Sequence, residues 1–143
     1  MKRFIFLAVA MLLAISAPVF ATYAERHAVS ITTASDGSAT SYSTVLNGKI
    51  SAIIYTKTDY DNGVDFTITS ETTGQNIWTE SNVNASTSRA PRQATHGVDG
   101  VASLYAAAGT AVQAPIVLAN ERVKIVLAQG GNAKTGTFTI ILE

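Results

Sequence analysis

The chain has 143 residues, ten basic and ten acidic residues, no cysteine and 47% hydrophobic residues. This length fits one domain with a core of its own. The balanced charge excludes the basic surface that nucleic-acid partners require. The lack of cysteine excludes disulfides and cysteine-ligated zinc, so packing alone must stabilise the fold. We expect neither a cofactor nor a nucleic-acid partner.

The first 21 residues have the parts of a secretory signal peptide. The segment begins with Lys2 and Arg3, continues with an apolar run from Phe4 to Ile15, and ends with small residues around Ala21. We expect cleavage after Ala21, which leaves 22–143 as the domain and places it in the periplasm or outside the cell. The alternative is an uncleaved membrane anchor, for which the apolar run is short. Contact with a membrane is expected through this segment only.

Short runs of alternating apolar and polar residues, separated by turn-forming residues, follow the signal-like segment. This pattern is typical of strands with one buried face. The predicted strands are His27–Thr33, Thr40–Leu46, Lys49–Lys57, Val64–Thr69, Asn76–Glu80, Pro115–Ala119, Arg122–Ala128 and Gly136–Leu142. No helical periodicity appears beyond the N-terminal segment. The sequence therefore predicts an all-β fold, an antiparallel β-sandwich or jelly-roll-like single domain.

Two places carry hairpin signals. Asn47-Gly48 is the strongest two-residue turn sequence in the chain, so we expect the strands on either side of it to pair. The last two predicted strands flank Gln129–Thr135, a polar loop with two adjacent glycines, and this predicts a closing hairpin. Lys49–Lys57 has apolar residues on both faces, which predicts a central strand that is covered on each side.

The region after residue 80 has no clear pattern. Residues 81–100 are polar and irregular, and long connections of this kind are usually functional or mobile. Val101–Ala107 fits either a strand or a helical turn. Arg89 and Arg92 lie on either side of a proline and are candidate contact residues for a neighbouring subunit; the alternative is a solvated loop.

Asp59, Asp61 and Asp65 are the only metal candidates in the sequence. They lie around Gly63, and calcium prefers such oxygen ligands. Their spacing does not match an EF-hand loop, which needs a glycine at its sixth position and a glutamate at its twelfth. Solvated acids in a loop tip are the interpretation we favour, so no metal is expected.

Tyr55, Tyr60 and Trp78 are candidate contact residues for a glycan or a peptide, because aromatic rings suit such ligands. Positions in the core of a sandwich explain the same residues, and we favour that interpretation. No catalytic motif such as G-x-S-x-G is present. We therefore expect no enzyme activity and no catalytic residues.

Several motifs resemble a family of small β-rich, virion-associated structural proteins of tailed bacteriophages and prophages. They are Gly48-Lys-Ile-Ser-Ala-Ile-Ile-Tyr55, Gly63-Val-Asp-Phe-Thr-Ile-Thr69, Ile77-Trp-Thr-Glu-Ser-Asn82, Ala90-Pro-Arg92 and Ala128-Gln-Gly-Gly-Asn132. The resemblance covers nearly all of residues 22–143. It implies a head-associated or decoration-like component that assembles with itself or with another structural protein.

The signal-like segment departs from that family, because phage heads assemble in the cytoplasm. Two functions therefore stand side by side. One is a non-enzymatic structural or assembly protein of a virion, expected to form a homo-oligomer. The alternative is an exported β-sandwich module that binds a glycan or a peptide in the periplasm or outside the cell.

Overall fold

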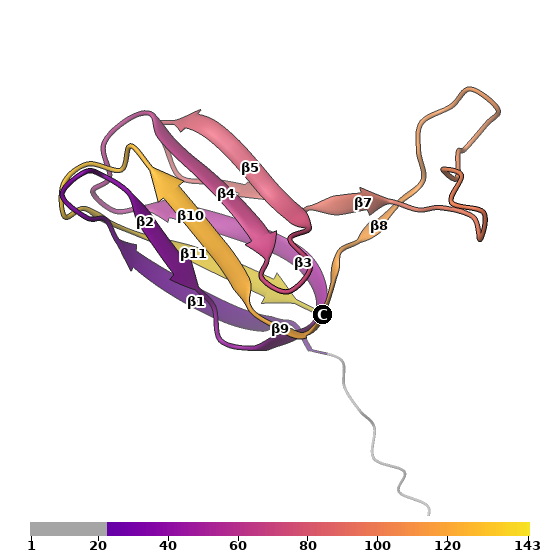
Figure 1. Cartoon of the computed structure of the whole chain (residues 1–143), viewed down its shortest axis with the longest axis horizontal. Helices are drawn as coiled ribbons and strands as arrows, with labels where there is room; N and C mark the ends of the chain where they lie inside the picture. Colours follow the sequence, from indigo (N-terminus) through magenta and orange to yellow (C-terminus); the bar gives the residue numbers. More distant parts are fainter. Residues whose placement is uncertain (1–22) are drawn as a thin grey trace, which may run out of the picture.

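The computed structural model describes residues 23–143, and the predicted signal peptide, residues 1–21, lies outside the described residues. The described residues form eleven strands and no helix. Figure 1 shows two facing sheets and a thin ribbon that projects away from them. None of the described residues belongs to a helix that is long and apolar enough to cross a membrane.

The strands of the two sheets are all antiparallel to their neighbours. The first sheet has the order β1-β11-β3-β6, with β9 also paired to β3, and the second has the order β2-β10-β4-β5. The bounds of the first sheet are β1 Glu25–Thr32, β3 Leu46–Lys57, β6 Thr87–Arg89, β9 Val117–Glu121 and β11 Thr135–Leu142. Those of the second are β2 Ala39–Tyr42, β4 Val64–Ser70, β5 Asn76–Val83 and β10 Val123–Ala128. The ribbon pairs β7, Arg92–Ala94, with β8, Gln113–Pro115.

One hydrophobic core fills the space between the sheets. In β4 and β11 every second residue is buried, as the alternation of apolar residues predicted. The rings of Tyr55, Phe66 and Phe138 meet at its centre, with centroids 5.0–5.2 Å apart. The predicted all-β, sandwich-like single domain is confirmed.

The expected closing hairpin is wrong. β10 pairs with β2 and β4 in the second sheet, whereas β11 pairs with β1 and β3 in the first. The chain crosses from one sheet to the other between these strands, and Gln129, Gly131 and Ala133 have positive φ there. Each of the two strands has apolar side chains along one face. With the strands in opposite sheets, these two apolar faces pack against each other in the core, which would not happen if the strands formed a hairpin within one sheet.

The expected turn at Asn47-Gly48 is also wrong. β3 runs through both residues, which pair with Ala119 and Leu118 of β9. Gly48 has φ of 137°, next to a register shift, and a Cβ there would stand 3.1 Å from the carbonyl oxygen of Glu143. The glycine thus serves a bulge and a close approach of the C-terminus, two other uses of glycine in strands.

The prediction for Lys49–Lys57 is half right. The strand lies inside the first sheet, between β11 and β6. Ser51 has no partner in the register with β11, and this bulge turns Ile50 and Ile53 to the same, buried face. Ile54 is only half-buried on the other face, so the strand is not covered on both sides.

The region after residue 80 is more regular than expected. β5 continues to Val83, and β6 and β7 follow within the segment expected to be irregular. Val101–Ala107 forms neither a strand nor a helical turn; its backbone makes isolated bridges at Ala102 and Leu104. Both bridges belong to the projecting ribbon.

Candidate functional site

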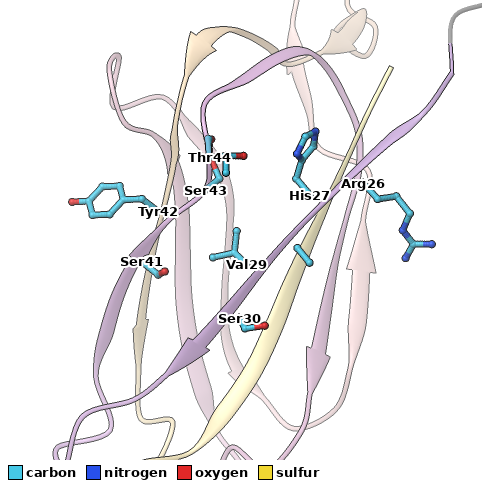
Figure 2. Close-up of a pocket in the computed structure, with 9 residues that line it drawn as sticks. Arg26, His27, Val29, Ser30, Ser41, Tyr42, Ser43 and Thr44 are labelled. Atoms are coloured by element: carbon cyan, nitrogen blue, oxygen red, sulfur yellow. The ribbon is translucent and has the colours of Figure 1, made fainter.

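A groove opens where the edges of the two sheets meet, between β1 and β2 (Figure 2). We call it the seam groove; its volume is about 430 Å³. It is lined by Arg26, His27, Ala28, Val29, Ser30, Ser41, Tyr42, Ser43 and Thr44. Figure 2 shows Val29 pointing from β1 into the space between the two strands, while Arg26 and Tyr42 extend away to either side.

The polar side chains of the seam groove serve the fold. The Ser43 hydroxyl donates to the carbonyl of Thr44 at 2.6 Å and accepts the N–H of Val123 at 2.9 Å. Ser30 Oγ lies 3.2 Å from Oγ1 of Thr137 on the neighbouring strand. His27 Nε2 lies 3.1 Å from the Glu25 carboxylate on the strand's own surface. These side chains are therefore engaged within the chain itself.

The second candidate site is the projecting ribbon, residues 92–115, which we call the arm (Figure 1). Beyond β7 and β8 its backbone continues to pair with itself: Thr95 donates its N–H to the carbonyl of Val112, and its own carbonyl accepts the N–H of Ser103. Two tight turns, at Gly97–Gly100 and at Ala106–Gly109, reverse the chain at the tip. The arm is therefore an ordered element of secondary structure with little contact to the sandwich.

The tip of the arm exposes apolar side chains. Tyr105 is 77% exposed and Val101 64%, while Val98 is fully exposed and Leu104 is exposed as well. These four residues lie among alanines and glycines. Large apolar side chains exposed on a projecting element are candidates for contact with another protein.

Contacts at the base attach the arm to the sandwich. Pro91 and Ile116, just outside the arm, are buried. Arg92 donates to the carbonyl of Pro91 at 2.9 Å and, at 3.4 Å, to that of Ile50. Gln75 donates from its side chain to that of Gln93. Of the two predicted contact arginines, Arg92 thus holds the base of the arm.

Arg89 lies on β6 and contacts its own chain. Its guanidinium donates to the Glu80 carboxylate at 2.6 Å and lies 5.9 Å from the centre of the Trp78 ring. Because this ion pair is half exposed, it contributes little to stability. The predicted pair of docking arginines is therefore divided between two elements.

The candidate aromatic contact residues form part of the core. Tyr55 is 0% exposed, Tyr60 2% and Trp78 6%. The Tyr60 hydroxyl donates to the carbonyl of Ile31 at 2.7 Å, and Phe66 packs edge-on against Trp78. This burial agrees with the interpretation favoured from the sequence, positions in the core, and leaves none of the three rings on the surface as a contact for a ligand.

The three candidate metal ligands have separate partners. Asp59 accepts the backbone N–H and the hydroxyl of Thr135, and these hydrogen bonds, the backbone one above all, hold its pKa below the usual value. Asp65 accepts the N–H of Asn82 and the side-chain amide of Gln129, and the Asp61 carboxylate lies against Gly131. Within residues 23–143 no group of three or more acidic or histidine side chains is placed to hold a metal ion.

The comparisons with known proteins add no relative. No protein-family model, no curated protein and no solved structure matches the chain. The assignment of a site therefore depends on the geometry of the seam groove and of the arm.

Sequence reasoning missed most of the residues that form these two sites. Val98, Val101 and Leu104 lie in a region of the sequence without a clear pattern, and the alternation in β1 gives no sign that its outer edge stays open. One signal is present in the sequence. Residues 92–115 have few charged residues and several turn-forming glycines, and they begin directly after Pro91 and end at Pro115, a composition typical of a separate small hairpin.

Proposed function

We propose that the chain is a non-enzymatic structural or assembly protein that works through protein–protein contacts, as virion components of tailed phages do. The observation that carries this proposal is the arm. A two-stranded ribbon is at best marginally stable in water, and this one exposes Val98, Val101, Leu104 and Tyr105 at its tip. Docking on another protein surface would bury these side chains.

The charge of the arm favours a protein partner. It contains one arginine and one aspartate, Arg92 and Asp99. Such a surface has no net charge with which to attract nucleic acid or an anionic membrane. An apolar protein surface is the complementary partner. In a homo-oligomer, every other copy of the chain provides such a surface.

The resemblance to phage virion proteins supports the same function, and residues 1–21 decide where it is carried out. We infer a periplasmic or secreted protein after cleavage at Ala21, with the virion as the alternative location. The intact mass and cell fraction of the expressed full-length chain test this point. A trimmed periplasmic product supports export, whereas an untrimmed cytoplasmic product that forms particles supports the virion.

The alternative function is an exported module that binds a glycan or a peptide. The candidate contact residues for this function are not on the surface. Tyr55, Tyr60 and Trp78 lie in the core, where a glycan would not reach their rings. A flat, exposed aromatic surface, the usual platform for sugars, is therefore not available from these three residues.

Shortening the arm tests the assembly function. Thr95 donates its N–H to the carbonyl of Val112, so replacement of residues 96–111 by Asn-Gly closes the ribbon with a two-residue turn. We expect the full chain to form oligomers at micromolar concentration and the shortened chain to sediment as a monomer.

The matched control is Val45→Ser, which removes an exposed valine from the body of the sandwich and should leave the oligomer unchanged. A full chain that remains a monomer at these concentrations would contradict the proposal. So would an oligomer that persists when the arm is shortened.

A further inference from the structure

The outer edge of β1 is an unprotected strand edge. β1 pairs with β11 over eight residues, Glu25 to Thr32, without a register shift, and with no other strand among residues 23–143. The other edges are short or irregular: β2 has four residues, β6 has three, and β5 has two register shifts against β4. Proteins usually block a long regular edge with charged side chains, proline or a bulge; in β1 the ionisable side chains are confined to Glu25–His27, and Ala28 to Thr32 has none of these features.

The hydrogen-bond pattern shows which backbone groups lie on that edge. Thr33 donates its N–H to the carbonyl of Lys134 at 2.9 Å. In an antiparallel pair the hydrogen-bonded positions alternate. The backbone N–H and C=O groups of Val29 and Ile31 therefore point towards β11, whereas those of Ala28 and Ser30 point outward. The close approach of Ser30 Oγ to Thr137 Oγ1 fits this phase, because side chains are closer at non-bonded pairs.

These outward groups lie along the seam groove. A strand that paired with Ala28 and Ser30 would continue the first sheet and place alternate side chains in the groove opposite β2. The groove holds about 430 Å³, and its lining combines hydroxyl side chains with Val29 and the larger side chains of Arg26, His27 and Tyr42.

The arm suits this acceptor in size and charge. Its residues 92–115 are as many as one side of a standard protein interface, about 20–30 residues. Near-neutral charge permits contact between identical chains, and among the described residues β7 and β8 pair only with each other, so the outer edge of each is open.

The arm cannot serve the β1 edge of its own chain. It follows β6, which lies at the opposite edge of the first sheet from β1. Figure 1 shows the arm projecting away from the sandwich, with β1 and β2 on the other side of the body. Donor and acceptor at opposite edges produce head-to-tail contacts, which close into rings or continue as filaments.

We propose that the arm of one copy adds as a strand to the free edge of β1 in a second copy, so that each copy both gives and receives a strand. This inference rests on the proposed assembly function and names its partner surface. It assigns Ala28 and Ser30 a role through their backbone and places the seam groove at the interface.

Crosslinking between two single-cysteine variants tests the proposal, because the chain has no cysteine of its own. Ser30→Cys marks the acceptor, and Ala102→Cys, Ala111→Cys or Gln113→Cys in separate variants marks the donor. The acceptor variant is mixed with each donor variant and treated with a short thiol-to-thiol crosslinker. We expect a mixed dimer with at least one donor position and little dimer from either variant alone.

The acceptor edge is then blocked in a variant that keeps its fold. Ala28→Pro, combined with Ser30→Cys, removes one outward N–H and leaves the ladder with β11 intact, since proline is tolerated on strand edges. We expect the mixed dimer to fall about tenfold, as the loss of one anchoring contact allows. Ala28→Ser, which keeps the N–H, is the matched control, and equal unfolding midpoints confirm the fold of both.

The outcomes separate the two proposals. A mixed dimer that falls about tenfold with Ala28→Pro supports strand addition to β1. Crosslinks between two donors only, or a mixed dimer that is insensitive to Ala28→Pro, would overturn strand addition and leave the assembly function standing. Cysteine variants that form no mixed dimer, together with a full chain that sediments as a monomer, would overturn both.

Discussion

Two tyrosines at the centre of the core differ in one hydrogen bond. The Tyr60 hydroxyl donates to the carbonyl of Ile31 at 2.7 Å, whereas the Tyr55 hydroxyl, also buried, has no hydrogen-bond partner among the described residues. Their rings stack with centroids 6.3 Å apart, and both are buried in the same core. The pair therefore isolates the contribution of a single buried hydroxyl.

We expect Tyr60→Phe to lower the free energy of unfolding by about 1 kcal/mol, because a buried hydrogen bond is lost. Tyr55→Phe should be neutral or stabilising, because it removes a buried polar atom without a partner. Urea unfolding monitored by the fluorescence of Trp78 measures both variants. Equal losses in the two variants would show that the Ile31 contact does not stabilise the fold.

The same tyrosines make the free energy of unfolding depend on pH in the alkaline range. Burial raises the pKa of Tyr55 from 10.0 to about 12 and also raises the pKa of Tyr60. Above pH 10 the unfolded chain loses protons that the folded chain keeps, so the free energy of unfolding falls as the pH rises towards 12. Below pH 10 this contribution is fully present.

Urea unfolding at a series of pH values across this window measures the fall in stability. We expect a shallower fall in the double variant Tyr55→Phe, Tyr60→Phe, because phenylalanine has no proton to lose. An unchanged slope in the double variant would assign the effect to other groups.

At the scale of elements, the crossing between β10 and β11 decides the architecture. Thr33, at the end of β1, is 4% exposed and ties this crossing down. Its hydroxyl donates to the carbonyl of Gly131 at 2.6 Å and accepts the N–H of Lys134 at 3.0 Å. One side chain thus satisfies two backbone groups of a segment that has left both sheets.

Thr33→Val keeps the shape of the side chain and removes both hydrogen bonds. We expect the free energy of unfolding to fall by about 1–3 kcal/mol, since buried backbone groups lose their partners. The neighbouring Thr32→Val, at an exposed position, should change stability by less than about 0.5 kcal/mol. Chemical denaturation measures both, and similar effects at the two positions would contradict the role of Thr33.

At the scale of the whole molecule, the arm is separable from the sandwich. Exposed loop tips are the preferred sites of proteolytic cleavage, and Leu104 and Tyr105 are exposed at the tip. We expect limited chymotrypsin digestion to cut first at these residues. The fragments should remain associated, because β10 and β11 on the second fragment are paired within both sheets.

Mass spectrometry of the digest and gel filtration of the nicked protein check this prediction. If the arm docks on a second copy, the cut should become slower as the protein concentration rises. An equal rate at all concentrations would mean that the tip stays free in the oligomer. Early cuts within β4 or β11 would contradict the separation of arm and sandwich.

The alternation of apolar residues in Val64–Ser70 and Thr135–Leu142 determined the strands, their buried faces and the sandwich class, because the period of two is a local property of the chain. It did not determine which strands pair. Asn47-Gly48 and the glycine pair before Ala133 look like hairpin turns in isolation, yet the first lies in a bulged strand and the second crosses between sheets. Only packing of both apolar stripes on one core decides this, since that energy is non-local.

The candidate sites follow the same division. The sequence determined that Tyr55, Tyr60 and Trp78 are apolar and aromatic, but whether they lie in the core or on the surface depended on the faces that the sheets bury. The free edge of β1 and the exposure of the arm exist only in the assembled fold, because an edge is defined by the strand that is missing beside it. Local composition determined the elements, and the tertiary structure alone decided which of their surfaces remain open to a partner.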